Sequence, residues 1–205
     1  MRKLCWWTMF PTPNETAMVC ALRRVGVDVV VCYFRKSLDG YRRMIGWRER
    51  PLEEWEYRAG SVREARRIIT DFDDRIQMVP SYSDAISWSL IFWCCIHGRP
   101  WLVSIERSRG GLLGWPLRRL FAFCAERAAL RVFCIGNSAM EQYARLGISR
   151  KKLCWTAYAM PAVLPRRCKE RMSTPDGVRF AFAGALSRRK AVDVLAEAFK
   201  AVRAS

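Results

Sequence analysis

The residues best suited to chemistry in this sequence follow a short apolar run. Glu106 ends the run 101–106 and is followed by Arg107 and Arg109. A carboxylate in that place can act as a general base or accept hydrogen bonds from substrate hydroxyl groups. It can equally form a salt bridge with a neighbouring arginine, and the residues alone do not separate the two interpretations. Glu106 is therefore a candidate catalytic residue.

A second candidate site lies near the C-terminus, where the apolar run 178–183 ends at Gly184 and is followed by Arg188, Arg189 and Lys190. The first turn of a helix offers free N–H groups and the positive end of the helix dipole, so an anion could bind there beside the lysine. Neither a Walker A loop nor G-x-G-x-x-G is present. On physical grounds alone a solvated helix cap is the favoured interpretation.

Strand-like and helix-like segments alternate along the chain and would position these residues. Strands are predicted at 3–10, 27–34, 75–80, 101–106, 131–136, 152–159 and 178–183. Helices are predicted at 15–26, 62–72, 85–96, 117–130, 138–147 and from about 191 onward. Residues 36–60 show no steady period and are predicted to form a long excursion. The alternation predicts an α/β fold with a Rossmann-like parallel sheet and helices on both faces.

Capping residues fix where the predicted helices begin and end. Asn14 is the predicted N-cap of the first helix, and Gly26 ends it. Ser61 and Glu64 form a capping box for the second. Two further caps are each left open between neighbours: Ser83 or Asp84, and Asn137 or Ser138.

Ligands of parallel sheets bind beyond the carboxyl ends of the strands. Residues that follow predicted strands are therefore candidates for a binding cleft beside Glu106. They are Asn14, Glu15, Arg107 and Asn137.

The net charge of +17 is unevenly distributed. Residues 45–98 hold seven basic and nine acidic side chains, whereas residues 99–172 hold fifteen basic and four acidic ones, a balance of +11. Such a segment suggests a face that meets phosphate groups, anionic lipid or nucleic acid. A solvated arginine-rich surface explains it as well.

The helix predicted at 117–130 has an apolar stripe with arginines beside it. A stripe of this kind could lie on an anionic membrane, but covering the sheet is the favoured interpretation. The stripe comprises Leu117, Leu120, Phe121 and Cys124, with Arg118, Arg119 and Arg127 off it and Trp115 at the helix start.

The nine scattered cysteines include no C-x-x-C pair, and there is one histidine. We expect reduced thiols in a cytoplasmic protein and no metal site. The longest uncharged stretch, 85–98, is too short to cross a bilayer, and no signal peptide is convincing.

Several motifs together resemble family 4 (group 1) retaining glycosyltransferases of the GT-B fold. Gly184, Lys190 and the pattern V-D-x-L-x-x-A-F at 192–199 are similar to the start of that family's nucleotide-sugar domain. The segments 21–35 and 128–161 are similar to its first β-α-β unit and to the end of its N-terminal domain. Ala185 and Ala191 stand where the family commonly has arginine and glycine.

The resemblance implies three parts of the chain. Residues 1–160 would form the acceptor-side domain, 161–176 a linker, and 177–205 an incomplete start of the nucleotide-sugar domain. Gly184, Arg189 and Lys190 would then bind the donor diphosphate, and the cleft residues would face the acceptor.

The resemblance also implies a function. The chain would be a truncated or split glycosyltransferase that moves a sugar from a nucleotide-sugar donor to a lipid-linked or polysaccharide acceptor. It would work in the cytoplasm, peripherally on the inner face of the membrane, without metal or cofactor, and a second polypeptide would supply the donor domain. The alternative is a non-enzymatic basic α/β module that binds anionic membrane or RNA. RNA ranks lower because the sequence has no nucleic-acid-binding motif.

Overall fold

The computed structural model describes residues 2–34, 51–108, 114–157 and 191–204. The chain divides into two compact units, Met1–Ala162 and Val163–Ser205. The predicted linker 161–176 and the predicted strand 178–183 lie outside the described residues.

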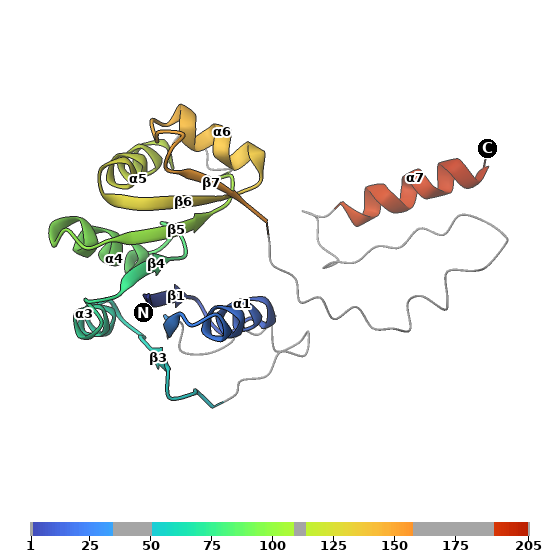
Figure 1. The fold of residues 1–205 in the computed structure, drawn as a ribbon. Coiled ribbons are helices and arrows are strands. Elements are labelled where there is room, and N and C mark those ends of the chain that lie inside the picture. Colours follow the sequence, from blue (N-terminus) through green and yellow to red (C-terminus); the bar gives the residue numbers. More distant parts are fainter. Residues whose placement is uncertain (1, 35–50, 109–113, 158–190, 205) are drawn as a thin grey trace. The chain divides into compact units, whose positions relative to one another are not determined.

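The described part of the first unit is built on one parallel sheet, which has seven strands in the order β3-β2-β1-β4-β5-β6-β7 (Figure 1). The strands are β1 Lys3–Thr8, β2 Asp28–Tyr33, β3 Glu56–Arg58, β4 Ile76–Val79, β5 Trp101–Ile105, β6 Ala129–Ile135 and β7 Leu153–Thr156. Every neighbouring pair is parallel. The strand order reverses between β1 and β4, which is where ligands of such sheets commonly bind.

Helices cover both faces of this sheet, as the sequence predicts. The helices among the described residues of the first unit are α1 Pro13–Arg24, α3 Val62–Asp71, α4 Ala85–Ile96, α5 Trp115–Ala128 and α6 Asn137–Arg145. Residues of α3, α4, α5 and α6 share one buried cluster on one face, whereas α1 packs on the other. The architecture is Rossmann-like α/β.

Strand β2 shows why a nearly continuous apolar run forms an inner strand. Val30 and Cys32 belong to the core beneath α3 to α6, while Val29, Val31 and Tyr33 belong to the core beneath α1. Successive side chains point to opposite faces, so a strand covered on both sides has no polar face.

The N-cap of α1 is Thr12, so the prediction of Asn14 is wrong. Thr12 Oγ1 accepts a hydrogen bond from the Glu15 N–H at 3.1 Å. Pro13 occupies the first helical position, where its fixed φ suits a helix and its missing N–H costs nothing. The cap therefore lies before the proline. The predicted end at Gly26 is confirmed, with φ +84°.

The remaining caps follow the predictions except at α6. Ser61 caps α3, as predicted, and Asp84 rather than Ser83 is the cap of α4. The predicted Asn137 or Ser138 cap is wrong because Gly136 holds the N-cap position of α6, without a side-chain cap. Its φ of +82° turns β6 directly into the helix, in a conformation that favours glycine.

Strand β3 was not predicted, since it falls in the supposed excursion 36–60. Its first residue, Glu56, is buried beside β2 and opposite Val31. Tyr33 donates its hydroxyl hydrogen to Glu56 Oε1 at 2.6 Å, which satisfies this buried carboxylate. A strand of three residues that begins with a charged side chain is too short to show the period of two that predicts a strand.

The apolar stripe predicted for the helix 117–130 is partly wrong. Helix α5 begins at Trp115 and buries Phe121, Ala122, Cys124 and Ala125. Leu117 and Leu120, which were expected to cover the sheet, are 51% and 40% exposed.

Of the helices described, none has both the length and the apolar character needed to traverse a bilayer. The eight cysteines among the described residues are free thiols.

Candidate functional site

The segment that follows β5 is held in place by α6. The Ser108 N–H donates to Gln142 Oε1 at 2.8 Å, and Gln142 Nε2 donates to the Ser108 carbonyl at 2.9 Å. From the next residue of α6, the Tyr143 hydroxyl donates to the Glu106 carbonyl at 3.2 Å. These bonds fix the backbone on both sides of Arg107. The segment Glu106–Ser108 is thus a positioned part of the sheet's carboxyl edge.

Two further aromatic residues, Tyr82 and Phe121, support the contact between Tyr143 and Glu106. The hydroxyl oxygens of Tyr82 and Tyr143 lie 2.9 Å apart, and Tyr82 stacks on Phe121 with ring centroids 4.3 Å apart. Burial, followed by the hydrogen bond with Tyr82, raises the pKa of Tyr143 above its usual value. Tyr143 therefore stays protonated at neutral pH and can donate to Glu106, while Tyr82 donates to Tyr143.

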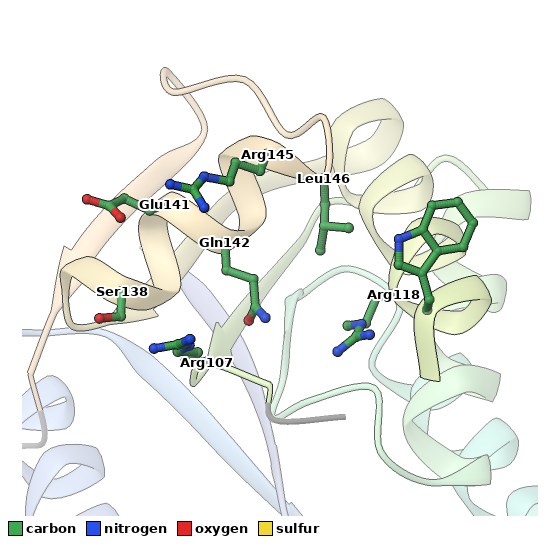
Figure 2. A pocket seen from close by; sticks show the side chains of 8 residues that line it. Arg107, Arg118, Ser138, Glu141, Gln142, Arg145 and Leu146 are labelled. Carbon is green, nitrogen blue, oxygen red and sulfur yellow. The ribbon is translucent and has the colours of Figure 1, made fainter. Parts of the chain in front are cut away.

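A pocket of about 400 Å³ lies between α5, α6 and this segment. Figure 2 shows Gln142 extending from α6 toward the space between Arg107 and Arg118. The lining carries three guanidinium groups and one carboxylate, so the pocket is basic. Its lining residues are Arg107, Trp115, Arg118, Ser138, Glu141, Gln142, Arg145 and Leu146.

Among the predicted cleft residues, Arg107 lines this pocket and Asn137 stands next to Ser138, which also lines it. Glu106 directly precedes Arg107, and its side chain is exposed. Among the described residues the Glu106 carboxylate forms no ion pair, and Arg109, the second arginine beside it, lies outside these residues. The loop salt bridge therefore also stays a prediction. A catalytic role for Glu106 stays a prediction.

Glu15 has a structural task at the start of α1. Its Oε1 accepts from the Thr8 hydroxyl at 2.6 Å and its Oε2 from the Thr12 hydroxyl at 2.9 Å. Burial raises the pKa of Glu15, although both hydroxyl groups oppose the shift by stabilising the carboxylate. The side chain joins the carboxyl end of β1 to the first turn of α1. Asn14 lies within that first turn, and the part that Asn14 and Glu15 were predicted to play in a cleft stays a prediction.

The residues that sequence reasoning missed come from helices rather than from strand ends. Arg118 belongs to α5, whereas Gln142 and Arg145 belong to α6. The rule that points to strand ends cannot find such residues. The +11 balance of residues 99–172 was the available signal, because it includes all three arginines of the pocket.

The predicted donor site lies outside the described residues, since Gly184, Arg189 and Lys190 all fall there. In the second unit the structure describes helix α7, Val192–Ala204, with Ala191 directly before it. Ala191 has φ +50°, in the left-handed region that favours glycine. This is the position where the resembled family usually has glycine.

Among the described residues, no three or more His, Cys, Asp or Glu side chains are grouped so that they could hold a metal ion. The expectation of a metal-free and cofactor-free site stays a prediction.

No family model matches the sequence, and no curated protein matches it. The fold is similar to solved structures of Anabaena Alr3699/HepE. For the complex with UDP and glucose the TM-score is 0.55 at 9% sequence identity, and for the complex with UDP-glucose it is 0.54 at 10%. The complex with UDP gives 0.53 at 10% identity.

The similarity covers 78% of this chain, which spans less than half of the Anabaena protein, 45% in the first of these structures. At this identity the likeness establishes the fold. Membership of glycosyltransferase family 4 stays a prediction.

Proposed function

We propose that this chain is the acceptor-side part of a GT-B-like glycosyltransferase. It would transfer a sugar from a nucleotide-sugar donor to a lipid-linked or polysaccharide acceptor. The observation that carries the proposal is the fold similarity to structures that hold UDP, UDP-glucose, or UDP with glucose. The motifs that resemble a nucleotide-sugar domain support the same class of enzyme.

The carboxyl edge of the sheet supplies the groups that such a reaction needs. Glu106 would accept a proton from the acceptor hydroxyl or orient that hydroxyl by a hydrogen bond. Tyr143 and Gln142 would hold the Glu106–Ser108 backbone in place for this task. Gly184, Arg189 and Lys190 would bind the donor diphosphate, with charge provided by Lys190 and Arg189.

The outer face of α5 favours a peripheral place on an anionic membrane. Trp115, Arg119, Phe123 and Arg127 follow one another at intervals of four residues and therefore share one helix face. Trp115 is 50% exposed and Phe123 is 64% exposed. A face that alternates aromatic and basic side chains suits the boundary between lipid headgroups and acyl chains. We infer that the enzyme works in the cytoplasm on the inner face of the membrane.

The test is the transfer of radiolabelled sugar from UDP-glucose and other nucleotide sugars into lipid and polysaccharide fractions. Extracts of cells that express the chain supply any second polypeptide, and the purified chain is assayed in parallel. We expect incorporation in the extract that depends on the chain, and little or none with the purified chain. Glu106→Gln is expected to reduce incorporation by at least about 100-fold, whereas Glu54→Gln, at an exposed acidic residue outside the site, leaves it unchanged.

Incorporation that never depends on the chain, with any nucleotide sugar, would overturn the proposal. Full turnover by the purified chain would overturn the need for a second polypeptide. The alternative of a basic module that binds membrane or RNA without catalysis is less favoured, because it leaves the resemblance to nucleotide-sugar enzymes unexplained.

A further inference from the structure

We infer that the pocket between α5 and α6 binds the phosphate group of an amphiphilic phosphate ester. If the proposed function is correct, this ester is the acceptor, so its assignment as acceptor rests on that function. The binding itself can be measured without any donor. The inference joins two features of the structure: a basic pocket, and an exposed aromatic face that begins at its rim.

The positive charge of the pocket indicates that the bound part of the ligand is a phosphate group. Arg107, Arg118 and Arg145 come from three different elements, the segment after β5, α5 and α6, and all line one cavity. A guanidinium group binds phosphate oxygens through paired N–H groups, and several of them can share one phosphate. With Glu141 as the one carboxylate in the lining, the net charge of the lining side chains is +2.

Neutral donors complete a site for oxygen atoms. Ser138 lines the pocket at the first turn of α6, so its hydroxyl group can donate to a phosphate oxygen. Gln142 holds the Ser108 backbone through both atoms of its amide group, which keeps the backbone next to Arg107 fixed. The site is therefore organised before a ligand binds, and this lowers the entropy cost of binding.

The aromatic residues at the rim of the pocket indicate that the ligand also carries a hydrocarbon chain. Trp115 lines the pocket and is 50% exposed, and the Arg119 guanidinium lies 4.9 Å from the centre of a Trp115 ring. Phe123 lies two turns further along the same helix face and is 64% exposed. A hydrocarbon chain attached to a phosphate in the pocket could leave past Trp115 and run along this face. Free phosphate or a sugar phosphate would leave these aromatic side chains unused.

The experiment measures direct binding of three probes to the full chain by calorimetry, in the absence of nucleotide sugar. Octyl phosphate carries both the phosphate group and a hydrocarbon chain. Inorganic phosphate lacks the hydrocarbon chain, and octyl glucoside has the chain but no charge. We expect octyl phosphate to bind at least about tenfold more tightly than either of the others. Arg118→Gln and Arg145→Gln should each weaken octyl phosphate binding by about tenfold.

Arg150→Gln is the matched control, because it removes the same charge from an exposed position that lies outside α5 and does not line the pocket. It should change the affinity for octyl phosphate by less than about twofold, the change expected of a charge outside the site. Circular dichroism verifies that each variant is folded, and the exposed Arg145 serves as the test if Arg118→Gln perturbs the helix.

Three results would overturn the inference. Equal affinity for inorganic phosphate and octyl phosphate would exclude an amphiphile, and equal affinity for octyl glucoside would exclude a role for the phosphate. Equal losses in Arg150→Gln and in the pocket variants would show a general effect of charge. Failure of the sugar-transfer assay leaves each of these readouts unchanged, so the two proposals fail separately.

Discussion

Gln142 and Ser108 are joined by two hydrogen bonds that run in opposite directions, one through each atom of the Gln142 side-chain amide. The two residues lie 34 positions apart in the sequence. The pair fastens α6 to the backbone beyond β5, two residues after the candidate base Glu106 and next to Arg107, which lines the pocket. The Gln142 side chain thus fixes the position of the backbone that follows Glu106.

Gln142→Ala is expected to release this backbone. Loss of both bonds should lower the free energy of unfolding by about 1–2 kcal/mol, since the polar groups of Ser108 lose their amide partner. Urea denaturation measures the stability, and hydrogen exchange of the Ser108 amide reports the local release. Glu141→Ala, at the exposed neighbour on α6, should change the stability by less than about 0.5 kcal/mol. An unaltered exchange rate at Ser108 would show that the amide pair does not hold the segment.

Glu15→Gln is expected to alter how stability depends on pH. Because burial raises the pKa of Glu15 above 4.5, the folded protein holds the Glu15 proton more tightly than the unfolded chain does. The stabilisation is therefore complete below pH 4.5 and is lost as the pH rises through the folded pKa. The free energy of unfolding of the wild type should fall over this window relative to Glu15→Gln, which cannot titrate.

Urea denaturation of both proteins at a series of pH values measures this difference. The carboxyl carbon of Glu15, followed by NMR, gives the titration midpoint directly. A midpoint below 4.5 would reverse the expected sign.

Arg75→Gln is expected to lower the free energy of unfolding by about 1–3 kcal/mol near neutral pH, because it removes contacts at the amino end of the sheet. Arg75 Nη2 lies 2.8 Å from Asp28 Oδ2, and Nη1 donates to the Asp28 carbonyl at 3.0 Å. The hydrogen bond from Arg75 lowers the pKa of Asp28 below 3.8. The contribution of the ionised Asp28 is thus present above pH 3.8 and is lost as the pH falls through the lowered pKa.

The difference between wild type and Arg75→Gln should accordingly shrink in acid, as measured by denaturation at several pH values. Lys3→Gln breaks the exposed pair of Lys3 with Asp74 and should have a much smaller effect, since exposed ion pairs contribute little. Similar losses in both variants would argue against a special role for Arg75.

Phe123→Ser is expected to weaken binding to vesicles that contain phosphatidylglycerol by at least about fivefold, because the exposed ring can no longer enter the lipid interface. Arg127→Gln should also weaken it by about fivefold, with no effect on neutral vesicles. Val25→Ser removes an apolar residue that is 76% exposed but belongs to the end of α1, and it should have no effect. Vesicle sedimentation measures all three. Equal binding of the variants and the wild type would exclude α5 as the membrane face.

The fold class could be predicted from the amino-acid sequence alone. Continuous apolar runs such as 27–34, alternating with helical periods, required a parallel sheet covered on both faces, because only burial on both sides tolerates strands without a polar face. Short-range signals likewise predicted Ser61 as the cap of α3 and Gly26 as the end of α1, and they limited the cap of α4 to Ser83 or Asp84. Each of these features depends on residues close together in the chain.

Strand β3 and the pocket residues depend instead on contacts between distant parts of the chain. Glu56 enters a strand because β2 offers it a neighbour and Tyr33 a hydrogen bond, and neither contact is visible in a local period. Arg118 and Arg145 share a pocket because α5 and α6 pack beside each other, and Gln142 reaches Ser108 for the same reason. Sequence periodicity reports which face of an element is buried, whereas a site depends on which elements become neighbours. Long-range packing alone makes that choice, and here it places side chains of α5 and α6 beside Arg107, which follows β5.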